Sequence, residues 1–505
     1  MMDSCHSRRD FLKSVGLGAA SLALPRFALG GVQPARKPNI VFVLADDLGY
    51  AELGCYGQEK IETPNLDRLA AQGMRFTQHY SGSPVCAPSR CTLLTGKHTG
   101  HAYIRDNYEI GGWGPDDPEG QLPLPEGTTT LGTLLQQQGY ATCAIGKWGL
   151  GGPDSTGHPN QQGFDHWYGY LCQRVAHNYY PTHLWRNDRK HVLEGNKYLP
   201  AHQRIESVPD DPSGYDRFKG VHYAPDLMVE EALEFIRKSK STPFFLYYAT
   251  PVPHAAIQVP DNSLAQYRGR WDDRPYLGQK GYLPHPAPRA GYAAMVTRMD
   301  RDVGRILSLL DELGLADNTI VMFSSDNGPT FNGGTDSAFF NSAGPLRGLK
   351  CSVYEGGIRV PLIARWPGRI KPGATSEHVS AFWDVLPTLA ELVSFAPPDD
   401  IDGISFAPTL LGQPGRQKQH EHLYWEYHGS QALRAGEWKA VRRKGQEALG
   451  LYDLKSDLGE QHDVAKAHPE IAARLAELMQ RARTESEHFP LHPVAKPLTA
   501  ESTED

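Results

Sequence analysis

This chain of 505 residues lacks several features that mark common classes of protein. Basic residues are not in excess: 51 Lys and Arg against 58 Asp and Glu give a formal net charge of −7, which argues against a nucleic-acid-binding protein. An anionic substrate is still allowed, because a local basic pocket can coexist with an acidic surface. Beyond the amino-terminal segment no apolar run is long enough to span a bilayer, and no repeat stands out. We expect a globular protein with no stable membrane span and no nucleic-acid partner.

Cysteine is also scarce. The chain has seven cysteines: Cys5, Cys55, Cys86, Cys91, Cys143, Cys172 and Cys351. They show neither the C-x-x-C spacing of a metal site nor a dense disulfide framework. One disulfide stays open as an option after export, and the sequence does not indicate which pair would form it.

The first 30 residues have the pattern of a targeting segment. Arg8 and Arg9 precede the apolar run Val15–Leu24, and small residues near Gly30 suit cleavage. The pattern resembles a bacterial twin-arginine (Tat) export signal. This resemblance implies the Tat translocase as a partner and a periplasmic or extracellular location. Residues 1–30 are therefore left out of the fold prediction.

Apolar, β-branched runs alternate with segments of helical periodicity over most of the remaining chain. The runs expected to be buried strands are 39–45, 141–148, 244–250, 319–325 and 360–366. The segments expected to be helices are 66–72, 131–138, 226–238, 292–313 and 382–392. Strands spaced by helices predict an α/β domain with a mostly parallel or mixed central sheet flanked by helices, over residues 31–415.

A Gly/Pro/Gln-rich stretch at 412–419 indicates a boundary. After it, short strands are expected at 423–427, 437–442 and 449–453, followed by a helix over 469–483. This order predicts a small C-terminal subdomain, residues 416–490, in which an antiparallel sheet packs with a helix. Residues 491–505 would form a tail.

The most informative stretch is Cys86–Gly96, which reads C-x-P-S-R-x-x-x-x-T-G. Pro88 has no N–H to lose in a first helical turn, and Ser89 suits a helix start. Cys86 is therefore predicted just ahead of a helix amino terminus, where free N–H groups and the helix dipole favour an anion. Arg90, one turn later, is placed to fork onto a tetrahedral oxyanion.

Two acidic clusters each follow a predicted strand. Asp46 and Asp47 form the first, and Asp326 and Asn327 belong to the second. Ligands of α/β sheets gather at the carboxyl ends of the strands, so these side chains are expected to converge. Three carboxylates and one amide oxygen make a hard oxygen site suited to Ca²⁺ or Mg²⁺.

With the Cys86–Gly96 motif, the sequence resembles the type I sulfatases of the alkaline-phosphatase superfamily, arylsulfatase-like enzymes that hydrolyse sulfuric esters. Blocks at 146–148, 345–350 and 355–361 match the same family in the same order. In that family the cysteine is oxidised to formylglycine (3-oxoalanine), whose hydrate attacks the sulfur of a sulfate ester. The resemblance implies a cytoplasmic formylglycine-generating enzyme as a partner. Export through Tat, which moves folded proteins, suits modification before export.

The resemblance also assigns roles to residues. Those that match the family's catalytic groups are Cys86, Arg90, Lys147, His254 and Lys350. Those that match its ligands for one divalent cation, with Ca²⁺ preferred over Mg²⁺, are Asp46, Asp47, Asp326 and Asn327. The two lysines would bind the sulfate group, and the histidine would give a proton to the leaving oxygen.

One position departs from the family pattern. The family's G-K-W-H-L-G block has a histidine that helps to deprotonate the diol, and Gly149 stands in its place here. His177 and His98 are the candidate substitutes. His177 is also expected to face the substrate, together with His428 and Gln431 of the small subdomain.

The insertions of this chain are rich in aromatic residues, which suit stacking on a sugar ring. A sulfated carbohydrate is therefore the favoured substrate, with small aryl sulfates as artificial ones. Two alternatives stay open: a phosphoester hydrolase of the same superfamily, and a catalytically silent binder of sulfated glycans. The Cys86 motif and the single oxygen-rich site argue against the first. The intact set of catalytic and ligand residues argues against the second.

Overall fold

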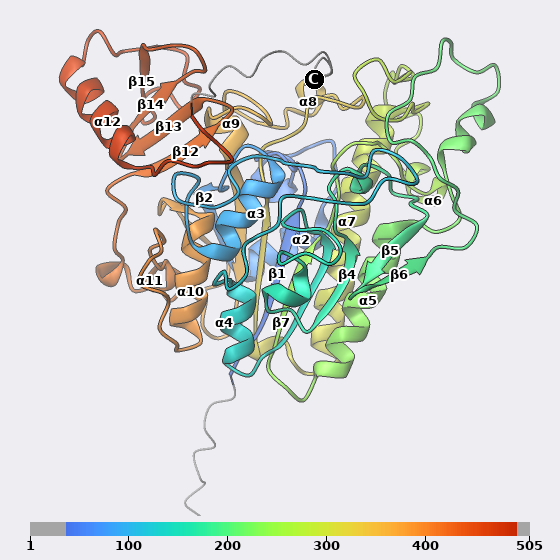
Figure 1. Cartoon of the computed structure of the whole chain (residues 1–505), viewed down its shortest axis with the longest axis horizontal. Helices are drawn as coiled ribbons and strands as arrows, with labels where there is room; N and C mark the ends of the chain where they lie inside the picture. The colour runs from blue at the N-terminus through green and yellow to red at the C-terminus, as the bar shows by residue number, and fades with distance from the viewer. Residues whose placement is uncertain (1–36, 492–505) are drawn as a thin grey trace, which may run out of the picture. The chain divides into compact units, whose positions relative to one another are not determined.

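The computed structural model describes residues 37–491 (Figure 1). The predicted signal segment, residues 1–30, and the predicted tail beyond Leu491 lie outside the described residues. All six cysteines of the described part are unpaired thiols. None of its helices is long and apolar enough to cross a membrane.

The larger of the two sheets has eleven strands among the described residues, in the order β10-β2-β9-β8-β1-β7-β3-β4-β5-β6, with β11 paired to β2. Its strands are β1 (Asn39–Ala45), β2 (Met74–Tyr80), β3 (Ala141–Lys147), β4 (His166–Tyr170), β5 (His183–Arg186), β6 (Arg189–Val192), β7 (Phe244–Ala249), β8 (Thr319–Ser325), β9 (Arg359–Arg365), β10 (Ala374–Ser376) and β11 (Ser380–Ala381). The central strands β8, β1, β7, β3 and β4 are parallel, whereas β9 and β5 pair antiparallel to their neighbours. The sheet is therefore mixed, as predicted.

Both faces of the central strands are buried, which is why these strands are apolar along their whole length. Side chains alternate along β1: Val41 and Val43 join one core cluster, and Ile40 and Phe42 join the other. Helices α2 (Pro64–Gln72), α5 (Ala224–Ser239) and α7 (Pro288–Glu312) contribute to the first cluster. Helices α3 (Cys86–Thr95), α4 (Leu131–Gln137) and α10 (Val385–Leu392) contribute to the second (Figure 1).

The remaining short α-helices of the large domain lie in connections between these elements. They are α6 (Asp261–Leu264), α8 (Ser337–Phe340), α9 (Glu355–Ile358) and α11 (Ala407–Leu410). The long insertions around residues 106–127 and 257–290 contain few regular elements, whereas residues 153–215 supply strands β4, β5 and β6 of the large sheet.

The smaller sheet is antiparallel, in the order β12-β13-β14-β15. Its strands are β12 (Leu423–Tyr427), β13 (Ser430–Ala435), β14 (Trp438–Arg442) and β15 (Leu449–Asp453), and helix α12 (Pro469–Arg481) packs on it. The indole N–H of Trp425 in β12 donates to the carbonyl of Ser81 at 2.9 Å, which joins this sheet to the large domain. The predicted small antiparallel sheet packed with a helix is confirmed.

Candidate active site

The site is built at the carboxyl ends of the parallel strands. Strand β1 pairs with β8 so that Ala45 lies beside Ser325, and the next residues are Asp46 and Asp326. Lys147 ends the parallel strand β3. Because all carboxyl ends of parallel strands face the same edge of the sheet, side chains far apart in the sequence meet there.

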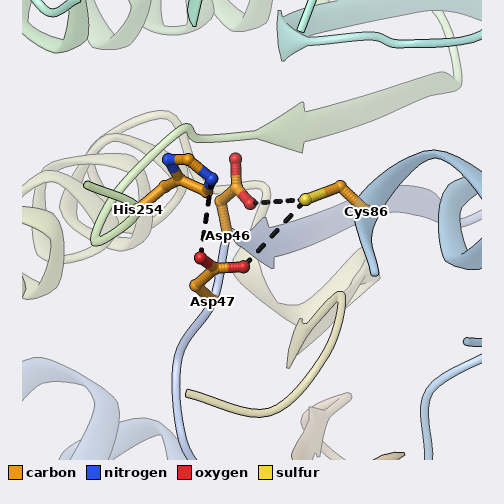
Figure 2. A group of neighbouring side chains, drawn as sticks. All are labelled: Asp46, Asp47, Cys86 and His254. Carbon is orange, nitrogen blue, oxygen red and sulfur yellow. Dashed lines mark hydrogen bonds and ion pairs between the residues drawn. The ribbon is translucent and has the colours of Figure 1, made fainter. Parts of the chain in front are cut away.

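Cys86 is the first residue of helix α3, and its side chain is buried. Its Sγ atom lies 3.3 Å from Asp46 Oδ1 and 4.0 Å from Asp47 Oδ1 (Figure 2). Two ammonium groups approach the same sulfur, Lys147 Nζ at 3.3 Å and Lys350 Nζ at 3.8 Å. The predicted juxtaposition of this cysteine with carboxylates and lysines is thus present, and the helix begins at the cysteine itself.

Three cations neutralise three carboxylates around Cys86. Arg90 donates from Nε and Nη2 to Asp326 Oδ2 at 3.1 and 2.7 Å. Lys147 Nζ lies 2.7 Å from Asp46 Oδ2, and Lys350 Nζ lies 2.9 Å from Asp47 Oδ2. We call these six residues, together with Cys86, the Cys86 cluster.

Burial shifts the pKa values of the acidic groups in this cluster. Burial, together with the charge of Asp46, raises the pKa of Asp326 to about 7. Burial opposes the ionisation of Asp46 too, but Lys147, His254 and Arg90 hold its pKa well below the usual range. Burial and Asp46 raise the pKa of the Cys86 thiol well above its usual value. An unmodified Cys86 is therefore a neutral thiol and a poor nucleophile.

The donor set suits a hard divalent cation. Asn327 Oδ1 is buried and has no hydrogen-bond partner within residues 37–491, while Nδ2 of the same side chain donates to Asp47 Oδ1 at 2.8 Å. Ligand atoms of Asp46, Asp47, Cys86 and His254 lie within 4.8 Å of one another. Oxygen atoms from Asp46, Asp47, Asp326 and Asn327 would hold the cation, and an unsatisfied amide oxygen is the atom such a cation would pair.

His254 lies on the other side of Asp47, with Nε2 3.6 Å from Asp47 Oδ2 (Figure 2). Its ring stacks on His177, with centroids 4.9 Å apart and planes at 14°. Burial and the charge of Lys350 lower the pKa of His254 to about 4. Burial and His254 lower the pKa of His177 well below its usual value. His177 therefore contacts His254, which in turn contacts Asp47 of the Cys86 cluster.

The other three predicted site residues lie further away. His98 contacts His101 and Asp402. Gln431 is buried in β13, where its amide donates to Tyr424 Oη at 2.7 Å and accepts from Arg442. His428 pairs with Asp106 at 3.0 Å and lines, with Arg105 and Tyr427, a cavity of about 450 Å³.

Sequence reasoning did not single out Asn107 or Gln173. Asn107 Oδ1 accepts from the backbone N–H of Ala87 at 3.0 Å and from Gln173 Nε2, also at 3.0 Å. Gly149 has φ of 82°, and a Cβ there would lie 2.9 Å from Gln173 Cγ. No motif marks either side chain, because both come from irregular insertions.

Two models of known protein families match the sequence of this chain. A family model described as Sulfatase matches residues 38–395. The chain belongs to the sulfatase family. A second model, described as N-sulphoglucosamine sulphohydrolase, C-terminal, matches residues 349–485 of this sulfatase. The resemblance to type I sulfatases is thereby confirmed, and the protein is an enzyme.

Several curated sulfatases are similar to this one over most of its length. N-acetylgalactosamine-6-O-sulfatase of Bacteroides thetaiotaomicron is 31% identical, over 90% of this chain and 94% of its own. Human N-acetylgalactosamine-6-sulfatase is 35% identical, over 82% of this chain and 72% of its own. Human arylsulfatase A is 33% identical, over 89% and 88%.

Solved structures show the same fold. Ps i-CgsB, crystallised in complex with k-i-k-neocarrahexaose, has a TM-score of 0.71 and 27% identity, over 88% of this sulfatase and 92% of that chain. A protein from a Bacteroides thetaiotaomicron locus for the metabolism of multiple glycosaminoglycans has a TM-score of 0.69 and 28% identity, over 88% and 99%.

Proposed function

We propose that this sulfatase releases inorganic sulfate from a sulfated carbohydrate and uses formylglycine derived from Cys86. The observation that carries the proposal is the position of Cys86. Cys86 is the first residue of helix α3, and its sulfur contacts Asp46. Two lysine ammonium groups lie within 3.8 Å of this sulfur. A neutral buried thiol makes no use of the positive charge of these lysines, whereas a residue that becomes sulfated does.

Formylglycine would supply a hydrate whose hydroxyl attacks sulfur and whose second hydroxyl allows sulfate to leave. Lys147 and Lys350 would hold sulfate oxygens, and they stabilise negative charge as it shifts towards the leaving oxygen. Arg90, fixed on Asp326, keeps the first turn of α3 against the strand ends. His254 would donate a proton to the leaving alkoxide, since a bound anion offsets the Lys350 charge that lowers its pKa.

The charge balance of the Cys86 cluster supports an anionic substrate. Its three carboxylates and three cations cancel one another. A divalent cation, which we propose to be Ca²⁺, would polarise the sulfate and would leave the pocket with surplus positive charge. An anionic sulfate ester, with one negative charge, offsets part of this surplus in the buried site, whereas an uncharged ester offsets none of it.

Similar proteins support a carbohydrate as the carrier of the sulfate. Curated relatives are named for N-acetylgalactosamine 6-sulfate esters, and Ps i-CgsB was solved with an oligosaccharide. The cavity lined by Asp106, Tyr427 and His428 offers polar and aromatic side chains for a sugar ring. We therefore place sulfated amino sugars and galactose-type sugars first in a substrate screen.

We further propose that Cys86 is oxidised in the cytoplasm and that the twin-arginine segment then directs export through Tat. Replacing Arg8 and Arg9 with lysine should keep the enzyme in the cytoplasm, as cell fractionation would show. Equal amounts of both forms outside the cytoplasm would contradict the proposed route.

The proposed function is tested on the tryptic peptide 76–90 and on the intact enzyme, produced in cells that mature another sulfatase. We expect the peptide mass of an aldehyde at position 86 and sulfate release from sulfated sugars. An unmodified thiol in those cells, with glycan binding but no turnover, would favour a silent binder. Faster hydrolysis of phosphate esters than of sulfate esters would favour a phosphoester hydrolase.

A further inference from the structure

The carboxamide of Gln173 is buried beside the active site and is only half satisfied. The residue follows β4 and is 1% exposed. Its Nε2 donates to Asn107 Oδ1 at 3.0 Å, whereas its Oε1 is buried with no hydrogen-bond partner in the described part of the chain. A buried carbonyl oxygen without a donor is unfavourable, so such an atom in a functional pocket points to a donor that arrives later.

The Gln173 carboxamide contacts two segments that also contact Cys86 or its neighbour Ala87. The first contains Asn107. Asn107 Oδ1 accepts from Gln173 and, at 3.0 Å, from the backbone N–H of Ala87, the residue after Cys86. This bond fixes the first turn of helix α3 to the Asn107 side chain. Gln173 is thus joined to the residue next to the nucleophile by two consecutive hydrogen bonds.

The second segment is Lys147–Gly149. Lys147 contacts the Cys86 sulfur, and Gly149 has no side chain and a φ of 82°. A Cβ at Gly149 would lie 2.9 Å from both Cγ and Cδ of Gln173 and 3.2 Å from its Oε1. The Gln173 carboxamide therefore fills the space that a side chain at position 149 would occupy.

We propose that Gln173 is a positioning residue for the nucleophile, and that its Oε1 accepts a hydrogen bond from a hydroxyl of the hydrated residue 86. The inference rests on the proposed formylglycine at this position. A thiol donates hydrogen bonds weakly, and a geminal diol has two strong donors. The modified residue thus supplies the donor that the cysteine form lacks, and the bond from Nε2 to Asn107 fixes the carboxamide in place.

The test compares Gln173→Met, which keeps the volume but removes acceptor and donor, with a matched control, Gln162→Met. Gln162 is also 1% exposed, its Nε2 also donates to one partner, and its Oε1 is also unpaired among the residues described. Gln162 contacts neither Asn107 nor Gly149. The second variant, Asn107→Ala, removes the acceptor that fixes the Gln173 carboxamide. It keeps the inference testable if Gln173→Met does not fold.

Two readouts are measured after the formylglycine content of each protein has been determined by mass spectrometry. The first is the rate at which an aminooxy probe labels residue 86, because losing the acceptor shifts the hydrate towards the free aldehyde. The second is kcat and KM for one sulfate ester. We expect Gln173→Met to label several-fold faster and to lose roughly tenfold in kcat with KM little changed, the size of one lost hydrogen bond.

Asn107→Ala should change both readouts in the same direction, and Gln162→Met should change neither. Labelling and kcat at wild-type values in both test variants would overturn the inference. A rise in KM alone would also overturn it, because Oε1 would then serve a hydroxyl of the substrate. Absence of aldehyde in the wild-type enzyme is a separate result, since it contradicts the proposed function itself.

Discussion

Two buried ion networks of this sulfatase differ in whether they contain groups without a hydrogen-bond partner that could bind a ligand. The Cys86 cluster gathers carboxylates and cations around a neutral thiol and beside an unpaired Asn327 Oδ1. The second network, which we call the Lys439 network, consists of Lys439, Glu355, Glu460 and Arg359. Lys439 Nζ lies 2.9 Å from Glu355 and 3.0 Å from Glu460, and Arg359 pairs with Glu355 at 3.2 Å. No thiol or unpaired amide faces this second group among the residues described.

The difference indicates what each network is for. Lys439 lies in strand β14 of the small sheet, and Glu355 starts helix α9 of the large domain, so their pair fixes one domain to the other. The Cys86 cluster joins strand ends that the sheet already holds together. Its charges are therefore available for a ligand, and we expect changes in it to affect catalysis more than folding.

The largest effect should come from the proposed nucleophile, Cys86. Cys86→Ala should lower sulfate release by at least about a thousandfold, since no residue remains to be sulfated, while the thermal midpoint changes little. Kinetics and calorimetry on the purified variant measure both. Cys91→Ala, which changes another buried cysteine of helix α3, is the control and should retain activity. Turnover by Cys86→Ala would exclude this residue as the nucleophile.

The Lys439 network should respond in the opposite way. Lys439→Met leaves Glu355 and Glu460 buried without their shared cation, and should lower the free energy of unfolding by about 3–5 kcal/mol. Urea denaturation measures this change, and kcat of the folded fraction should be nearly unchanged. Lys444→Met, at an exposed position after β14, should be neutral. Equal stability of the two variants would remove the distinction between the networks.

Removal of one proposed ligand charge tests the open part of the Cys86 cluster. Asp47→Asn keeps the shape of the side chain, and should weaken binding of Ca²⁺ by about 10–100-fold, with a matching loss of activity at limiting metal. Calcium titration after treatment with a chelator measures the affinity. Asp67→Asn, at a partly exposed position in α2, is the control. An unchanged calcium affinity would exclude Asp47 as a ligand.

The smallest expected effect concerns a buried acid outside both networks. Burial, together with Asp226, raises the pKa of Asp302 in α7 to about 7. Between about pH 4 and pH 7, Asp302 is therefore protonated in the folded state and ionised in the unfolded state. The free energy of unfolding falls as the pH rises through this range. Relative to wild type, Asp302→Asn should gain about 1–3 kcal/mol between pH 5 and pH 8. Denaturation curves at both values measure the gain.

A control for this prediction lies on the same helix. Asp311→Asn changes an acid whose side chain is 63% exposed, and should show no pH-dependent difference from wild type. A pH-dependent gain of equal size in both variants would show that it arises from net charge and not from the burial of Asp302.

Much of this fold was predictable because its central strands are buried on both faces. Strands β1 and β8 have the predicted bounds, and β3, β7 and β9 begin or end within one residue of them. Strand β2, MRFTQHY, was not predicted, because its polar residues interrupt the apolar pattern. Strand β13 was also missed, because the His428-Gly429 turn, with φ of 47° and 76°, lacks the usual Asn-Gly or Asp-Gly signal.

The candidate site was predictable to the extent that motifs mark it. Cys86, Lys147 and Lys350 come from contiguous blocks, and the Nζ atoms of both lysines lie within 3.8 Å of the Cys86 sulfur. Asn107 and Gln173 come from insertions without periodicity, so their approach to Ala87 and Gly149 depends on tertiary structure alone. The same holds for His428, whose cavity is lined by segments far apart in the sequence, such as residues 105–106 and 426–429.

The burial of Cys86 limits when it can be altered. Its side chain is 1% exposed, at the amino terminus of helix α3 and against Asp46 at the end of strand β1. A second enzyme could not bring its own reactive centre to this sulfur once the fold has closed. Under the proposed function, oxidation at position 86 would therefore have to occur on the nascent or unfolded chain. The cell would then have a single interval, between synthesis and folding, in which to activate each molecule.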